Sequence, residues 1–204
     1  MKVNGLILAA GMSTRMKEFK PLMKIGERTM IETTVLHMFE AGVDQVTVVV
    51  GFRGYEVKEV LKNLEPDQRR LQIVENPAYA TTQMLDSIQI GLSVMGDCDG
   101  FFLTPGDMPA ISTGTYRKLL DQAGKSSYKL IFPVIDGYRK HPPFISSQCR
   151  DQILEFRGEG LRALWKEYEG EILELPMQDE GCTMDADYQA DFMKICRYML
   201  PAMT

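Results

Sequence analysis

The chain has 204 residues, of which 45% are hydrophobic and 25% are charged, a composition that excludes general disorder and predicts a sizeable core. Its 23 basic and 28 acidic residues give a formal net charge of −5, which argues against a protein that binds nucleic acid through overall charge. No apolar run approaches the ~18 residues of a membrane span, so we expect a cytoplasmic protein, organised as one domain over residues 1–204, that binds neither membrane nor nucleic acid.

Strand and helix patterns alternate through the first half of the chain. Residues 4–10 form a continuous apolar run, typical of a parallel strand buried on both faces. Thr29 is a good N-cap for a helix over residues 30–41, which Gly42 ends. Further patterns predict strands over residues 45–50, 71–74 and 100–103 and helices over residues 57–64 and 83–94.

The second half continues this alternation. It predicts helices over residues 115–123, 153–156, 161–168 and 187–200 and strands over residues 129–134 and 172–175. Residues 135–147, which include two consecutive prolines, are the best candidate for an inserted loop or flap. Strands separated by helices indicate βαβ units, so we predict a three-layer α/β/α sandwich with a mostly parallel sheet.

The sulfur-containing residues favour a structural role. The four cysteines form no C-x-x-C pair and lie far apart in the sequence, so we expect reduced thiols in a reducing compartment and no zinc site. The 14 methionines are dispersed along the chain, which favours core filling over a metal-binding array.

The strongest functional signal is the loop after the first predicted strand. Gly11 stands at the strand end, where glycine permits an unusual backbone angle and the close approach of a ligand. Ser13 offers a neutral donor, and Arg15 and Lys20 add two positive charges. Open α/β sheets bind ligands at the carboxyl ends of their strands, so this set suits a polyphosphate. The alternative interpretation is a turn with two solvated cations.

This loop also resembles a known signature. The sequence L-A-A-G-M-S-T-R-M over residues 8–16, followed by K-P-L over residues 20–22, is similar to that of nucleotidyltransferases of the MobA/MocA type, which have a GT-A-like fold. The resemblance implies that the loop wraps the phosphates of an NTP and that Lys20 reaches the transferred α-phosphate. The nucleotide-binding residues that it implies here are Leu8, Ala9, Ala10, Gly11, Ser13, Arg15 and Lys20.

Two further segments resemble the metal-binding parts of this family. The turn Pro105-Gly106-Asp107 follows a predicted strand, and a carboxylate there is suited to hold Mg²⁺, with Mn²⁺ as the alternative. Residues 184–192 resemble the family segment D-I-D-T-P-E-D-Y, although Tyr-Gln-Ala replaces Thr-Pro-Glu. The resemblance implies a second metal ligand at Asp185 or Asp187 and leaves that choice open. The alternatives are a Pro-Gly turn with a solvated carboxylate and an acidic helix N-terminus.

The remaining candidate residues concern the base and the acceptor substrate. Asn76 and Gln83 stand where this family places a loop near the base, although a lone Asn after a strand is usually a turn former. The segment around Lys140 and His141 resembles the G-H-P segment of molybdopterin cytidylyltransferases, which lies toward the acceptor, with lysine in place of the glycine. The alternative for that segment is a solvated basic loop.

These residues predict a nucleotidyltransferase that moves a nucleoside monophosphate from an NTP to a phosphorylated acceptor and releases pyrophosphate. Arg15, Lys20 and Asp107 are the expected catalytic residues. Guanylyltransferases of the group usually read L-A-G-G, so Ala10 favours CTP. The resemblance then implies molybdopterin or its molybdenum form as acceptor and a molybdenum hydroxylase, or its chaperone, as protein partner. Two alternatives stay open: a phosphocholine or sugar-phosphate nucleotidylyltransferase, and a non-catalytic nucleotide-binding regulator or cofactor chaperone.

Overall fold

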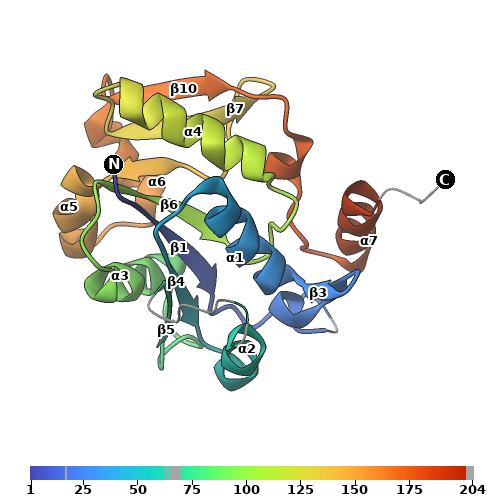
Figure 1. Ribbon diagram of the computed structural model, residues 1–204. Helices are drawn as coiled ribbons and strands as arrows, with labels where there is room; N and C mark the ends of the chain where they lie inside the picture. The colour runs from blue at the N-terminus through green and yellow to red at the C-terminus, as the bar shows by residue number, and fades with distance from the viewer. Residues whose placement is uncertain (17, 63, 65–69, 201–204) are drawn as a thin grey trace.

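The computed structural model describes residues 1–16, 18–62, 64 and 70–200. Among these residues, eight strands form one sheet, in the order β10-β7-β9-β6-β1-β4-β5, with β8 paired to β7 (Figure 1). The strands are β1 Val3–Ala9, β4 Gln45–Val50, β5 Leu71–Glu75, β6 Gly100–Pro105, β7 Leu130–Ile135, β8 Tyr138–Arg139, β9 Phe144–Ser146 and β10 Ile172–Pro176. A separate hairpin pairs β2 (Lys24–Ile25) with β3 (Arg28–Thr29).

The sheet is mostly parallel, as predicted. Strand β1 pairs in parallel with both β4 and β6, and β5 and β10 extend the sheet in the same sense. Strand β9 is antiparallel to β6 and to β7. The prediction of an inserted loop over residues 135–147 is therefore wrong for residues 138–139 and 144–146, which form β8 and β9. Phe144 and Ile145 are 3% and 0% exposed, so burial of these two side chains brings the segment into the sheet.

Helices cover both faces of the sheet and complete the predicted sandwich (Figure 1). They are α1 Met30–Ala41, α2 Gly54–Leu61, α3 Met84–Val94, α4 Thr113–Lys125, α5 Arg150–Glu155, α6 Leu161–Leu164 and α7 Gln189–Met199. One apolar cluster joins the sheet to α1, α2 and α4, and a second joins it to α3, α5 and α6. Short 3₁₀ helices lie at Lys20–Leu22, Ser147–Cys149, Trp165–Tyr168 and Glu180–Thr183.

Helix α1 shows how local signals set its ends. The Thr29 hydroxyl accepts from the Glu32 amide, and the Glu32 carboxylate accepts from the Thr29 amide, which completes a capping box. Gly42 ends the helix in the left-handed conformation with φ of 100°. The predicted helix over residues 57–64 corresponds to α2, which ends at Leu61; residue 63 lies outside the described residues.

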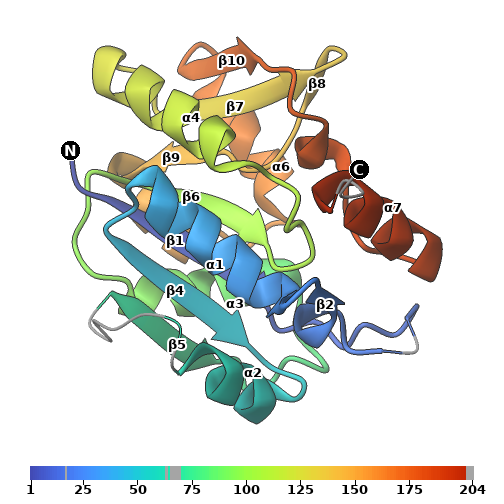
Figure 2. The same ribbon diagram turned by 45° about the vertical axis from the view of Figure 1, so that its right-hand side comes forward.

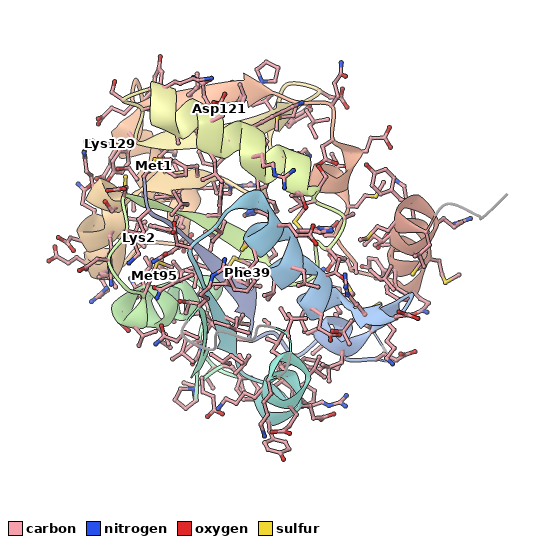
Figure 3. All side chains as sticks on the ribbon, in the orientation of Figure 1. Met1, Lys2, Phe39, Met95, Asp121 and Lys129 are labelled. Atoms are coloured by element: carbon pink, nitrogen blue, oxygen red, sulfur yellow. The ribbon has the colours of Figure 1, made fainter. Side chains whose placement is uncertain are left out.

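The end of the sheet opposite the predicted site is closed by contacts between chain segments. The backbone N–H of Lys2 donates to the carboxylate of Asp99 at 2.6 Å. Figure 3 shows Lys2 and Met95 on the side of the molecule away from α7. The loops after β1 and β6 therefore lie together at the other end, where the strand order reverses around β1, the usual position of a ligand site.

A third apolar cluster brings the end of the chain to this site. It joins the hairpin β2–β3 to α7, and Figure 2 shows both elements toward the right of the molecule. Its buried members are Met16, Met23, Ile25, Met30, Ala110, Met184, Ala186, Phe192 and Ile195. Four of these nine residues are methionines, so the predicted role in core filling holds for them, whereas Met1, Met12, Met84 and Met193 are exposed.

Two other expectations concern the chain as a whole. All four cysteines are free thiols, as predicted. Within the described ranges, no helix is long and apolar enough to cross a membrane.

Candidate active site

A cavity of about 270 Å³ opens at the carboxyl ends of β1 and β6. Three stretches of chain line it: the loop after β1, the segment that leads into α3, and the turn after β6. The lining residues are Leu8, Ala9, Ala10, Gly11, Ser13, Lys20, Pro21, Tyr79, Thr82, Gln83, Met84, Ser87, Pro105, Gly106 and Asp107. Seven of the nine predicted nucleotide-binding residues, together with Asp107, therefore line one cavity; Arg15 and Asn76 do not.

The turn after β6 lies directly against β1. The Gly106 amide donates to the Leu8 carbonyl oxygen at 2.8 Å, and a Cβ on Gly106 would lie 3.0 Å from that oxygen. Any larger residue would push the turn away from the strand. Glycine at this position therefore fixes where Asp107 stands relative to the first loop.

The first loop is held by Ser13. This residue adopts the left-handed conformation with φ of 52°, and its hydroxyl accepts from the Lys20 amide at 3.2 Å. The expected unusual backbone angle at Gly11 is wrong, because the left-handed residues of the chain include Ser13 and not Gly11. Gly11 instead has no atom within 4 Å of where a Cβ would stand, so it leaves open space beside the cavity.

Lys20 connects two acidic segments that are far apart in sequence. Its Nζ lies 3.0 Å from Oδ2 of Asp107 and 2.9 Å from Oδ1 of Asp187. The Lys20 side chain is only 12% exposed, whereas those of Asp107 and Asp187 are 26% and 34% exposed. A largely enclosed cation thus faces two carboxylates that are more open to solvent.

The ionisation of this group follows from these contacts. Burial acts to lower the pKa of Lys20, but hydrogen bonds and charge attraction from Asp187 and Asp107 outweigh it and raise that pKa above its usual value. The hydrogen bond from Lys20, with further attraction from Lys20 and Arg15, holds the pKa of Asp187 below its usual value. Both side chains are therefore charged at neutral pH.

The two candidates for the second acidic ligand differ in position. Asp187 contacts Lys20, and its other oxygen accepts from Nη1 of Arg15 at 2.6 Å. Asp185 is exposed; Ala186, between the two, is buried, and its amide donates to the backbone carbonyl of Asp107 at 3.2 Å. The structure thus brings Asp187, not Asp185, to Lys20 and Asp107.

Arg15 stands at the rim of the site. Its side chain is 61% exposed and is not among the residues that line the cavity. Its contact with Asp187 nevertheless places its charge beside Lys20. The predicted pair of cations is therefore together, with Lys20 inside and Arg15 outside.

Asn76 organises the other end of the cavity without lining it. It is 1% exposed, its Nδ2 donates to the hydroxyls of Thr82 at 2.9 Å and Ser87 at 3.0 Å, and its Oδ1 accepts from the Ala78 amide at 3.0 Å. Every polar atom of its side chain is used in this way. The structure thus commits each polar atom of the Asn76 side chain to a contact within the protein, and the expected contact with the base or ribose stays a prediction.

Four residues that line the cavity at this end were not among the predicted site residues: Tyr79, Thr82, Met84 and Ser87. Tyr79 packs against Gly51, where a Cβ would lie 2.6 Å from the Tyr79 Cβ, and its ring lies 6.3 Å from that of Phe52. A glycine directly after the β-branched run 45–50 is the sequence signal for this close approach.

Lys140 and His141 lie outside the cavity lining but near the same edge of the sheet. Nδ1 of His141 lies 3.2 Å from the carbonyl oxygen of Leu103 on β6. Burial lowers the pKa of His141, although that hydrogen bond and the charge of Asp107 act to raise it. The imidazole is therefore neutral at pH 7, and Nδ1 carries the proton because a carbonyl only accepts.

The donor set suits a metal that is shared with a substrate. Lys20 already shows that one cation fits between Asp107 and Asp187. Within the described part of the chain, no three His, Cys, Asp or Glu side chains gather as a metal site. Mg²⁺ typically takes one or two carboxylates and completes its shell with phosphate oxygens and water, so two carboxylates beside a cavity fit this kind of ion.

Comparisons with known proteins agree with this geometry. Residues 5–172 match the MobA-like NTP transferase domain family. The chain is 28% identical to the molybdenum cofactor cytidylyltransferase of Escherichia coli (strain K12), over 75% of this chain and 74% of that protein. It is 30% identical to the probable molybdenum cofactor guanylyltransferase of Bacillus mycoides (strain KBAB4), over 69% and 66%. A nucleotidyl transferase from Methanothermobacter thermautotroptrophicus shares the fold, with a TM-score of 0.80 at 22% identity over 98% of each chain.

Proposed function

This chain belongs to the MobA-like NTP transferase domain family, and on that premise we propose that it transfers the CMP unit of CTP to the phosphate of molybdopterin or its molybdenum form. The observation that carries the proposal is the convergence of Lys20, Asp107 and Asp187 beside the cavity. Two carboxylates and an ammonium at one point are suited to hold a metal ion and the phosphates of a nucleotide together. The proposal treats residues 1–204 as one nucleotidyltransferase domain, because the sheet takes strands from β1 to β10 and α7 packs at the site.

The proposed reaction needs no protein nucleophile. An oxygen of the acceptor phosphate attacks the α-phosphorus of CTP in line, and the bond from that phosphorus to the β-phosphate oxygen breaks, so pyrophosphate leaves with the electron pair. Lys20 and Arg15 stabilise the negative charge that develops on the phosphates. Asp107 and Asp187 would hold Mg²⁺, or Mn²⁺ in its place, which neutralises phosphate charge when bound. The rest of the cavity acts by fixing the reactants in position.

The base is proposed to lie at the end of the cavity near Ser87. Asn76 donates to both Ser87 and Thr82, and the Thr82 hydroxyl donates to the Ala78 carbonyl. Ser87 therefore accepts from Asn76 and keeps its own proton for the cavity that it lines. Such a donor suits O2 or N3 of cytosine. Ala10, which also lines the cavity, carries a methyl group that narrows the space for a purine.

The acceptor is proposed to approach from the side of β9. Lys140 supplies positive charge there for an anionic acceptor. His141 is neutral with Nδ1 bonded to Leu103, so we assign it to holding the loop of Lys140 in place rather than to charge pairing. A molybdenum hydroxylase or its chaperone is the protein that would receive the product, and the cytoplasm is the proposed compartment.

Pyrophosphate release tests the proposal and its alternatives together. Purified protein with Mg²⁺ is given CTP, GTP, UTP or ATP, each with molybdopterin, phosphocholine, a sugar phosphate or no acceptor. We expect release that requires an acceptor, with CTP and molybdopterin the best pair. GTP is the competing donor, since a guanylyltransferase is among the relatives. Release with no pair would favour a binding protein over an enzyme.

The choice of base has its own test. Ala10→Gly removes the methyl group, and the ratio of kcat/KM for CTP to that for GTP should fall by about 10–200-fold, the range expected for a steric effect of ~1–3 kcal/mol. An unchanged ratio would remove Ala10 as a reason to choose CTP, while the transfer reaction itself would stand.

A further inference from the structure

Four charged side chains beside the cavity are joined to one another by ion pairs. Lys20 contacts Asp107 and Asp187, and Arg15 contacts Asp187. Two positive and two negative groups leave this set with a formal charge of zero. The acidic pair therefore offers no net negative charge to an approaching metal ion.

The Lys20 ammonium stands where Asp107 and Asp187 would both contact a shared metal ion. Nζ donates to one oxygen of Asp107 and to one oxygen of Asp187. A divalent ion that bound both oxygens would lie between them, at about 2.1 Å from each for Mg²⁺. The ammonium and the metal ion therefore exclude one another from that space.

Burial of the two carboxylates would not by itself keep a metal ion away from them. The side chains of Asp107 and Asp187 are 26% and 34% exposed, so solvent reaches both. Lys20, at 12% exposure, is the more enclosed partner, and water screens a buried charge weakly. Its charge is thus the main obstacle to a second cation.

We propose that Lys20 is an internal counter-ion that disfavours binding of a divalent metal ion to Asp107 and Asp187 until a nucleoside triphosphate binds and Lys20 pairs with its phosphates instead. The triphosphate carries several negative charges and offers Lys20 and Arg15 a stronger partner than a single carboxylate. When Lys20 and Arg15 pair with the phosphates, the carboxylates of Asp107 and Asp187 become available to the metal ion. Metal consequently binds together with the nucleotide or after it, and not before it. This order rests on the proposed function, since it requires a nucleotide in the cavity.

Mn²⁺ binding without turnover tests the proposal. Free Mn²⁺ is measured by electron paramagnetic resonance as it is titrated into the full chain, first alone and then with a CTP analogue that carries a methylene bridge between the α- and β-phosphates. Native protein should bind Mn²⁺ at least about tenfold more tightly with the analogue than without it, a difference of about 1.4 kcal/mol. Mn²⁺ bound by the analogue alone is measured separately and subtracted.

A matched pair of variants isolates the role of Lys20. Lys20→Met keeps most of the side-chain length and removes the charge, whereas Lys24→Met removes the same charge from an exposed position on β2. Without nucleotide, Lys20→Met should bind Mn²⁺ at least about tenfold more tightly than native protein, and Lys24→Met should stay within about twofold. The double variant with Asp107→Asn should lose the gain.

The result that overturns the proposal is Mn²⁺ affinity in Lys20→Met equal to that of native protein. If Lys20→Met does not fold, native protein decides: equal Mn²⁺ affinity with and without the analogue overturns it as well. Failure of the proposed function is a separate result, because it appears as absent pyrophosphate release, whereas the titration without nucleotide needs no turnover.

Discussion

Lys20 donates a hydrogen bond of 3.0 Å to Asp107, which lies 87 residues further along the chain. The contact joins the end of the first loop to the turn after β6. Ser13 holds the Lys20 backbone, and Gly106 holds the turn against β1. Two loops at the point where the strand order reverses are thus linked by opposite charges, and this link places a cation and a carboxylate beside one cavity.

Lys20→Ala removes the cation from this pair. We expect turnover to fall by at least ~10²-fold, because a charge that stabilises the transition state is lost. The free energy of unfolding should fall by about 1 kcal/mol or less, since the two carboxylates stay partly exposed. Initial rates and urea denaturation measure the two effects, with Lys24→Ala as the control. Near-normal turnover in Lys20→Ala would contradict the proposed contact between Lys20 and the α-phosphate.

Asp187→Asn and Asp185→Asn form a pair of neighbouring substitutions with the same change in charge. Asp187 contacts Lys20 and Arg15, whereas Asp185 is exposed. Asp187→Asn should lower Mg²⁺-dependent turnover by at least ~10²-fold, and Asp185→Asn should stay within about threefold. Rates measured over a range of Mg²⁺ concentrations distinguish the two. A more severe loss in Asp185→Asn would reverse the assignment.

Ser87→Ala tests the donor at the proposed base end. The variant removes one hydroxyl, so KM for CTP should rise by about tenfold, the equivalent of one hydrogen bond of ~1–1.5 kcal/mol, with kcat little changed. Equal KM values in native protein and Ser87→Ala would remove Ser87 from base recognition.

Asn76→Ala should lower the free energy of unfolding by about 1–3 kcal/mol, because it leaves buried partners unpaired.

His141 should titrate below its model-peptide value of about 6.5. Burial lowers its pKa in the folded protein, so below about pH 6.5 the unfolded chain takes up a proton that the folded chain does not. The free energy of unfolding should therefore decrease as the pH falls through this range. A proton NMR titration of the His141 ring, assigned with His141→Gln, gives the pKa directly. A midpoint at or above about 6.5 would contradict the lowering of the His141 pKa by burial.

The parts of the fold that local signals determine were predictable. Thr29, Glu32 and Gly42 fix the ends of α1, and the apolar runs give β1 and β4 to within a residue. Strand β9 was missed because a run of three residues after two prolines carries almost no periodicity, and its pairing with β6 and β7 is a long-range effect.

The site residues likewise divide into those that local sequence signals indicate and those that depend on long-range packing. Lys20 and Asp107 stand in recognisable motifs at strand ends, so sequence was enough to propose them. The choice between Asp185 and Asp187 was not accessible, because it depends on how the third apolar cluster packs the end of the chain against the hairpin β2–β3. The inward role of Asn76 depends likewise on contacts with Thr82 and Ser87 that form only in the fold.

Nucleotidyl transfer at Asp107 and Lys20 is tested by acceptor-dependent release of pyrophosphate from CTP by native protein and by Asp107→Asn. The substitution keeps the shape of the side chain and removes the charge that Mg²⁺ requires. We expect Mg²⁺-dependent release by native protein with molybdopterin as acceptor and a loss of at least ~10²-fold in Asp107→Asn. Release by Asp107→Asn at the native rate, with the same dependence on Mg²⁺, would contradict transfer at this site.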